Sequence, residues 1–199
     1  MRLFDYFLEQ PFLFNLSQLP FTRQKFARIL KHNDLSQVRR VLDVGCGPGT
    51  NAPSFAHAYY QGIDINPRYI ELARRRFHRD FHVADMTKYE ISSNDAYDFI
   101  LINSFLHHID TDSVHRILAR TPYLLAPEGH VHSIEVVMPP RRGLSQLLAR
   151  WDRGNFARPV DEWKAIFSSH LKTVVFEPFP VRHLGQTLME MVYFKGRMS

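Results

Sequence analysis

The chain has 199 residues, of which 45% are hydrophobic, so it is long enough for one well-buried domain and short for two; we predict a single domain over residues 1–199. Its net charge of +5 would attract nucleic acid, phosphorylated molecules or an anionic membrane only mildly, and the arginine clusters are better explained as solvated helix faces. The single cysteine, Cys46, excludes an intramolecular disulfide and a zinc cluster built from thiolates, and it fits a reducing, cytoplasmic setting.

The amino-terminal segment, residues 1–35, is rich in aromatic residues, and Pro11 and Pro20 divide it into short helical pieces. It lacks the continuous apolar run of a signal peptide, and nothing elsewhere approaches the run of about 18 apolar residues that a membrane span needs. We expect these pieces to form a cap that packs over the sheet. Two functional alternatives stay open: a lid that lines an apolar substrate pocket, and an amphipathic surface that makes a peripheral membrane contact.

Residues 41–50 join a short apolar strand to a loop with three glycines, which are Gly45, Gly47 and Gly49. Glycine leaves the backbone free to adopt positive φ and lets a ligand approach the main chain closely. Asp43, the only ionised residue of this run, is placed where its carboxylate could meet a ligand at the end of the strand. A phosphate-binding P-loop is excluded because no lysine follows within six residues of Gly49. A dinucleotide fingerprint is disfavoured because Thr50 stands where its third glycine would be.

A second strand, predicted at residues 59–65, ends in the acidic residue Asp64. Asp64 lies 21 residues beyond Asp43, close to the interval of about 20 residues at which an acidic side chain reaches a ribose hydroxyl in nucleotide-binding α/β folds. The plainer alternative is that Asp64 ends its strand and caps the helix that Pro67 opens. Position and residue type together favour the ribose role.

The remaining chain alternates predicted strands and helices, which indicates a mainly parallel sheet with helices on both faces. Residues 97–103 are apolar enough for a central buried strand. Residues 139–170 are expected to form an insertion over the active site. The predicted strands are 40–44, 59–65, 81–84, 97–103, 131–137, 173–177 and 188–194, and the predicted helices begin near residues 50, 67, 112 and 160.

The pattern D-x-G-x-G-x-G after a strand, with acidic residues ending the next two strands, resembles the class I S-adenosylmethionine-dependent methyltransferases of the small-molecule type. Residues 38–138 carry this resemblance. It implies a Rossmann-like three-layer sandwich with a seven-stranded sheet, an antiparallel last strand and the cofactor S-adenosyl-L-methionine. In that family an acidic residue after the third strand meets the adenine amino group and the next side chain packs on the ring, which assigns these roles to Asp85 and Met86. The cofactor-binding residues that the resemblance implies are Asp43, Gly45, Cys46, Gly47, Gly49, Asp64, Ile65, Asp85, Met86, Asn103 and Ser104.

Methyl transfer from a sulfonium is an in-line displacement, to which alignment of the two reactants contributes strongly. A hydroxyl acceptor would also benefit from a general base, and histidine has the ordinary pKa for that work near neutrality. The strand at 97–103 is followed by His107 and His108, which are the candidate bases, with His107 preferred. The alternative is that such a histidine only bonds the loop or contacts the cofactor. The candidate substrate-binding residues are Glu135, Arg153 and Arg158, the arginines because a guanidinium holds a carboxylate or phosphate in bidentate fashion.

The aromatic segment at residues 1–35 favours a methyl acceptor that is an oxygen or nitrogen of a small, apolar or lipid-like molecule. Metal dependence is not expected, because the polar residues after the fourth strand do not reproduce the metal cluster of the catechol type. Two other functions stay open: an RNA or protein methyltransferase that uses the arginine clusters, and a non-catalytic S-adenosylmethionine-binding module that acts through a partner. A nucleic-acid partner is disfavoured, since Asn103 and Ser104 do not begin the Asn-Pro-Pro-Tyr motif of the DNA adenine methylases.

Overall fold

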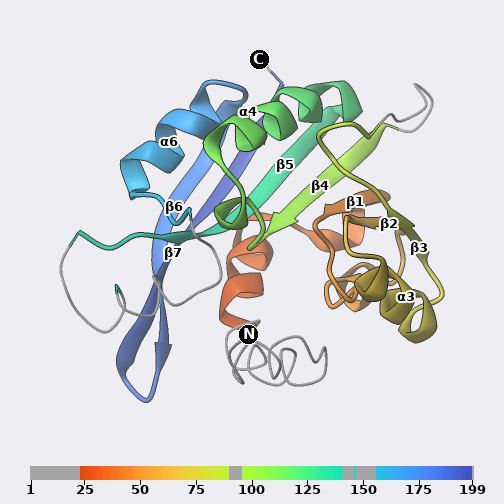
Figure 1. Ribbon diagram of the computed structural model, residues 1–199, viewed down its shortest axis with the longest axis horizontal. Helices are drawn as coiled ribbons and strands as arrows, with labels where there is room; N and C mark the ends of the chain where they lie inside the picture. The colour runs from red at the N-terminus through yellow and green to blue at the C-terminus, as the bar shows by residue number, and fades with distance from the viewer. Residues whose placement is uncertain (1–22, 90–95, 141–145, 147–155, 199) are drawn as a thin grey trace.

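Seven strands form one sheet in the part of the chain that the computed structural model describes, residues 23–89, 96–140, 146 and 156–198 (Figure 1). Their order across the sheet is β3-β2-β1-β4-β5-β7-β6. Strands β1 to β5 pair in parallel, and β7 is antiparallel to both of its neighbours. The predicted α/β fold is therefore confirmed. The strands are β1 (Arg40–Val44), β2 (Tyr59–Asp64), β3 (Asp80–Val83), β4 (Tyr97–Asn103), β5 (Leu125–Val137), β6 (Lys172–His183) and β7 (Gln186–Arg197).

The strand order reverses between β1 and β4, which lie side by side at the centre of the sheet. From β1 the chain builds β2 and β3 on one side, and it then returns to build β4 and β5 on the other. The connections that follow β1 and β4 therefore leave the sheet in opposite directions, and a crevice opens at their carboxyl ends. This edge of the sheet is where a ligand site is expected in such a fold.

Helices cover both faces of the sheet, which gives three layers (Figure 1). On one face, Phe26 and Ile29 from the helical residues 23–32 pack in a buried cluster with Ile70. On the other face, Ile117 and Trp163 belong to the second buried cluster. No helix in the described ranges is long and apolar enough to cross a membrane. The α-helices with fully described bounds are α3 (Pro67–Arg76), α4 (Thr111–Arg120) and α6 (Val160–Ser168).

Two connections differ from their predicted helices. Only the short 3-10 helix η2 (Ala52–Phe55) forms after the glycine loop, with a proline in its first turn. The helix predicted to begin near residue 112 begins at Thr111, ends at Arg120 and continues as the 3-10 helix η4 (Thr121–Leu124). Pro122 explains this change, since it has no N–H for the helical ladder.

The last strands are longer than predicted, and β6 and β7 form a hairpin that projects beyond the other strands (Figure 1). Pro178 and Pro180 led to a predicted strand end at residue 177, yet both lie within β6 and pair with β7. Because β6 is the edge of the sheet, the missing N–H of a proline can face outward without breaking a ladder bond. The chain turns at Leu184 and Gly185, both of which have positive φ.

Candidate functional site

The glycine loop turns sharply at the carboxyl end of β1. Its three glycines have φ of +69°, +53° and +77° in chain order, a left-handed conformation that other residues rarely adopt. The N–H groups of Gly45 and Cys46 both donate to the carbonyl oxygen of Ile63 in β2, at 2.8 and 3.0 Å. A Cβ added to Gly45 would lie 2.6 Å from Cγ of Phe105, so this position has no room for a side chain.

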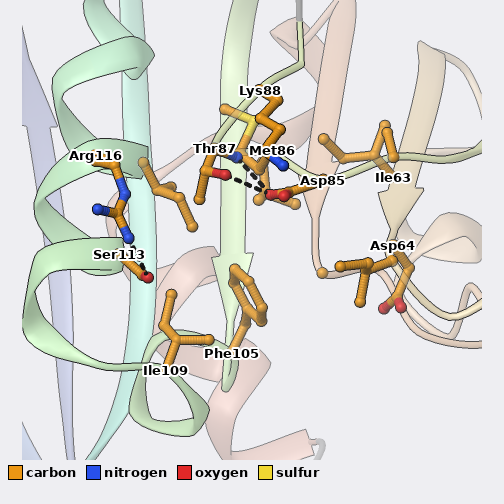
Figure 2. Close-up of a pocket in the computed structure, with 15 residues that line it drawn as sticks. Ile63, Asp64, Asp85, Met86, Thr87, Lys88, Phe105, Ile109, Ser113 and Arg116 are labelled. Carbon is orange, nitrogen blue, oxygen red and sulfur yellow. Dashed lines mark hydrogen bonds between the residues drawn. The ribbon is translucent and has the colours of Figure 1, made fainter.

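A cavity of about 540 Å³ opens beside the loop, between the ends of β2 and β3 and the first turns of α4 (Figure 2). This volume falls within the range of about 300 to 1,000 Å³ that is typical of small-molecule sites. Five residues predicted to bind the cofactor line it: Gly45, Asp64, Ile65, Asp85 and Met86. The structure therefore brings together, at one edge of the sheet, residues that lie up to 41 positions apart in the chain.

Asp64, the last residue of β2, connects the glycine loop to the start of α3. Its Oδ2 accepts a hydrogen bond from the N–H of Gly47 at 2.9 Å, and its Oδ1 accepts one from the N–H of Asn66 at 2.8 Å. Burial raises the pKa of Asp64, and these two N–H groups oppose that rise. The helix cap of α3 is Asn66, whose side chain accepts from the N–H of Arg68 at 3.0 Å. The carboxylate of Asp64 thus contacts the loop and the cavity, and the capping is done by its neighbour.

Asp85 and Met86 form the wall of the cavity beyond β3 (Figure 2). The Oδ1 atom of Asp85 accepts from the N–H of Thr87 at 2.9 Å and from its hydroxyl at 2.7 Å. These hydrogen bonds hold the pKa of Asp85 below its usual value. Met86 is 96% buried and contributes an apolar surface beside this carboxylate.

Asp43 lies beneath the loop, outside the lining of this cavity, and is 1% exposed. Its Oδ2 accepts from Asn51 Nδ2 at 3.0 Å and from the Tyr60 hydroxyl. Among the described residues no donor reaches its buried Oδ1. Burial raises the pKa of Asp43 to about 7, against the hydrogen bonds from Tyr60 and Asn51. Asp43 is therefore a carboxyl group that can change its ionisation near neutral pH.

Asn103 and Ser104 extend a chain of side-chain hydrogen bonds from Asp43 to the amino-terminal helix. Asn103 Nδ2 donates to Asn51 Oδ1 at 3.2 Å, and the Ser104 hydroxyl donates to Asn103 Oδ1 at 3.3 Å. Lys25 Nζ donates to the Ser104 hydroxyl at 3.1 Å, with the lysine itself buried. The predicted residues at the end of β4 thus lie on the side of the loop where residues 23–32 pack.

Three other predicted cofactor residues belong to the loop itself. Cys46 is buried in the hydrophobic core, and burial raises the pKa of its thiol. Gly47 contacts Asp64 as described. Gly49 has Phe81 and Phe77 behind it, at 2.9 and 3.1 Å from an added Cβ. These residues shape the backbone of the loop.

His107 is held by Glu135, which lies in β5. The Glu135 carboxylate accepts from the backbone N–H groups of Phe105, Leu106 and His107 at 3.3, 3.1 and 3.3 Å. Its Oε2 lies 2.7 Å from His107 Nδ1, and both side chains are at most 1% exposed. Because a carboxylate can only accept here, Nδ1 carries the proton, and in the neutral ring the lone pair is on Nε2. Glu135, predicted to bind substrate, thus uses its carboxylate to hold this turn.

The other predicted catalytic and substrate residues are placed differently. His108 is exposed, and its ring lies 4.2 Å from that of His107. Arg158 is 4% exposed, and its guanidinium donates to backbone carbonyls of the same turn. Arg153 lies outside the described residues. The segments around residues 107, 135 and 158 therefore meet behind one wall of the cavity.

Sequence reasoning missed the wall of the cavity that α4 provides. Ser113, Arg116 and Ile117 line it from one face of this helix, and Arg116 donates to the Ser113 hydroxyl at 2.9 Å (Figure 2). Their spacing of three and four residues was a usable signal, because such residues share a helix face. Lys88 adds a second cation to the lining. No group of three or more His, Cys, Asp or Glu within the described ranges could hold a metal ion.

Comparison with known proteins identifies the domain. Residues 41–129, from β1 into β5, match the family model of a methyltransferase domain. These 89 residues of the chain therefore belong to a methyltransferase domain. The family predicted from the glycine loop and the strand ends is therefore confirmed, and the matched residues include every cavity residue named above.

Curated relatives of this methyltransferase domain include proteins named for O-methylation. The chain is 31% identical over 111 residues to a ubiquinone biosynthesis O-methyltransferase of Rhodopseudomonas palustris, which covers 53% of this chain and 43% of the relative. It is 30% identical over 128 residues to the methyltransferase GfsG of Streptomyces halstedii, covering 59% of this chain and 43% of the relative. The chain thus spans less than half the length of these curated relatives.

A solved structure shares the fold over most of the chain. The N-methyltransferase NodS from Bradyrhizobium japonicum WM9 is 21% identical, with a TM-score of 0.65 over 89% of this chain and 97% of that protein. Similarity at this level of identity supports the fold of the methyltransferase domain.

Proposed function

We propose that this protein binds S-adenosyl-L-methionine in the cavity beside the glycine loop and transfers its methyl group to an oxygen or nitrogen of a small molecule. One observation carries the proposal: Gly45, Asp64, Asp85 and Met86 converge on a single cavity of about 540 Å³ in a methyltransferase domain. The relatives named O-methyltransferases favour an oxygen acceptor.

The residues that line the cavity bind different parts of the cofactor. Asp64 takes the ribose hydroxyls, because each of its carboxylate oxygens has a second lone pair beside the one that accepts from Gly47 or Asn66. Asp85 accepts from the adenine amino group, and Met86 packs against the ring. Ser113, Arg116 and Ile117 close the opposite side. The cations at Arg116 and Lys88 help to keep Asp85 ionised as an acceptor.

The bound cofactor supplies a methyl group that is already activated on a sulfonium. The work left to the chain is to align an acceptor and, for a hydroxyl, to remove its proton. We assign removal of this proton to His107, because Glu135 fixes its Nδ1–H and so directs the basic lone pair to Nε2. Since His107 does not line the cofactor cavity, this role requires the acceptor to bind outside that cavity, where it can reach Nε2. Formation of an imidazolium beside the buried Glu135 carboxylate would be stabilised by their 2.7 Å contact.

We infer an apolar or lipid-like acceptor from the aromatic content of residues 1–35, of which residues 1–22 lie outside the described part of the chain. Contacts of the arginines argue against an RNA or protein acceptor. Arg74 donates to the carbonyl oxygen of Phe81, and Arg79 donates to those of Ala56 and Ala58. Two arginines near the sheet edge are thus engaged in holding loops of the domain.

Calorimetry with S-adenosylmethionine and S-adenosylhomocysteine tests the cofactor assignment directly. We expect both to bind at one site. A panel of phenols, quinols and amines then tests turnover through release of S-adenosylhomocysteine. Failure of both ligands to bind would remove the proposal, whereas binding without turnover on any acceptor would favour the non-catalytic module.

Asp64→Ala is expected to weaken S-adenosylhomocysteine binding by about 100-fold, because hydrogen bonds to charged groups are worth about 1.5 to 3 kcal/mol each. The matched control is Asp80→Ala, which removes a partly exposed carboxylate at the start of β3, away from the cavity. Calorimetry measures both affinities, and circular dichroism checks that each variant is folded. Equal affinity in Asp64→Ala and the unaltered protein would refute the ribose assignment.

His107→Asn is expected to lower kcat by about 10²- to 10⁴-fold on a hydroxyl acceptor, the usual contribution of a positioned base. Its affinity for S-adenosylhomocysteine should stay within about threefold, since the histidine lies outside the cavity lining. His108→Asn serves as the control because that ring is adjacent but exposed. A similar loss of kcat in both variants would argue against His107 as the base.

A further inference from the structure

The turn between β4 and α4, residues 104–110, makes few hydrogen bonds of its own. It opens at Ser104, which has a φ of 56°, and contains the 3-10 helix η3 (Leu106–His108). Two backbone bonds lie inside it, from His108 to Phe105 at 3.0 Å and from Ile109 to Leu106 at 3.3 Å. Its remaining contacts come from other parts of the chain, so other segments determine where the turn lies.

Arg158 holds the carbonyl side of this turn. Its Nη1 donates to the carbonyl oxygen of Leu106 at 3.3 Å. Its Nη2 donates to the carbonyl oxygen of Ile109 at 3.0 Å and to the Thr111 hydroxyl at 3.1 Å. The N–H of Phe156 donates to the carbonyl oxygen between these two, that of His107, at 3.2 Å. Residues 156–158 thus hold three carbonyl groups of the turn, while Glu135 holds its N–H groups.

The guanidinium of Arg158 is itself fixed in place. The backbone carbonyl oxygen of Arg158 accepts from the N–H of Met138 at 2.8 Å, which attaches the backbone of Arg158 to the end of β5. Its Nε lies 3.3 Å from Glu162 Oε1, and its Cζ lies 4.9 Å from the ring centre of Trp163. With 4% of its surface exposed, Arg158 has a single well-determined position. A planar fork can reach two carbonyls at once, which a lysine ammonium on a flexible stem cannot reproduce.

The other side of the turn faces the cavity. Phe105 and Ile109 line it (Figure 2). The Phe105 ring lies so close to Gly45 that no Cβ fits between them. A shift of the turn by a fraction of an ångström would therefore change the cavity wall and the space over the glycine loop. Arg158 does not line the cavity, so any effect on a ligand must pass through the turn.

We propose that Arg158 is a positioning residue of the ligand cavity, which it serves by holding residues 104–110 so that Phe105 and Ile109 form the correct wall. The inference rests on the proposed function only for the choice of ligand in its test. It replaces the substrate-binding role predicted for Arg158, because the guanidinium is engaged by backbone carbonyls and by Glu162.

The test compares Arg158→Lys and Arg158→Met with Arg75→Met, which removes an exposed arginine paired with Glu71 in α3. Calorimetry measures affinity for S-adenosylhomocysteine, and hydrogen exchange measures protection of the amides of residues 105–109. We expect Arg75→Met to behave as the unaltered protein. Both Arg158 variants should bind about 10- to 100-fold more weakly, as expected for a misplaced wall, with faster exchange confined to the turn.

The outcomes separate this inference from the cofactor assignment. If the unaltered protein binds no S-adenosylhomocysteine, the proposed function fails, and exchange at residues 105–109 still decides whether Arg158 holds the turn. Unchanged affinity in a folded Arg158→Lys variant would overturn the positioning role, and this variant decides if Arg158→Met does not fold. Faster exchange throughout the sheet, with a matching drop in melting temperature, would also overturn it, because Arg158 would then support general stability alone.

Discussion

Replacing Gly45 with alanine is expected to abolish measurable binding of S-adenosylhomocysteine and to lower the free energy of unfolding by about 2 to 4 kcal/mol. Two effects add at this position. The backbone has a φ of +69°, which a residue with a Cβ adopts at a cost, and the new methyl group would lie 2.6 Å from Cγ of Phe105. The ring must then move into the cavity or away from the loop. Calorimetry and chemical denaturation measure the two losses.

The next glycine of the loop provides the matched control. Gly47 has a φ of +53° but nothing within 4 Å of an added Cβ, so Gly47→Ala should lose only the conformational part, about 1 to 2 kcal/mol. Adding Phe105→Ala to Gly45→Ala should recover part of the stability, because it removes the atoms that clash. Equal losses for the two alanine variants, or no recovery in the double variant, would show that the contact with Phe105 is unimportant.

Asp43→Asn is expected to stabilise the ligand-free protein by about 4 kcal/mol at pH 8 and by only about 2 kcal/mol at pH 5. Burial raises the pKa of Asp43 to about 7 in the folded state, from 3.8. Folding therefore binds a proton between these values, and stability that is present below pH 4 is lost as pH rises through 7. The neutral amide avoids this loss, which corresponds to about 4 kcal/mol above pH 7. Thermal melts should show a rise on the order of 10 °C at pH 8.

The same substitution should impair function. Asp43 belongs to the motif from which the cofactor site was predicted. Its Oδ1 atom has no donor among the described residues. We expect affinity for S-adenosylhomocysteine to rise with pH through about 7 in the unaltered protein and to be weaker and independent of pH in Asp43→Asn. Asp80→Asn, at a partly exposed carboxylate, should change neither quantity. If the difference in stability between Asp43→Asn and the unaltered protein were the same at pH 5 and pH 8, the raised pKa would be contradicted.

Local sequence patterns predicted the central strands well and the edge strand poorly. β1 and β4 lie at residues 40–44 and 97–103 as predicted, because each is a short apolar run that ends at glycine or a polar residue. The prediction for β6 ends at residue 177, before Pro178, whereas the strand continues to His183. Whether a proline disrupts a strand depends on whether a neighbouring strand needs its N–H, and only the position of β6 at the sheet edge decides this.

The residues of the candidate site were likewise predicted in part. The sequence predicted the lining residues at strand ends, Asp64 and Asp85, because parallel strands bring their carboxyl ends to one edge and the spacing of the strands is visible in the chain. It did not reveal the α4 wall, where Ile117 served equally well as a core residue. Nor did it reveal that Arg158 would hold backbone carbonyls, since such a contact has no residue pattern of its own.

The sequence by itself determined the order of strands and helices, the glycine loop, the acidic strand ends and hence the methyltransferase family. These follow from local preferences, such as the positive φ that only glycine adopts freely and the periods of apolar side chains, about 2 residues in a strand and about 3.6 in a helix. Only the tertiary structure decided that Phe105 covers Gly45, that Glu135 and Arg158 hold one turn from opposite sides, and that Asp43 is buried. These features depend on contacts between residues far apart in the chain, and the free energy of such contacts is set by packing and burial rather than by residue type.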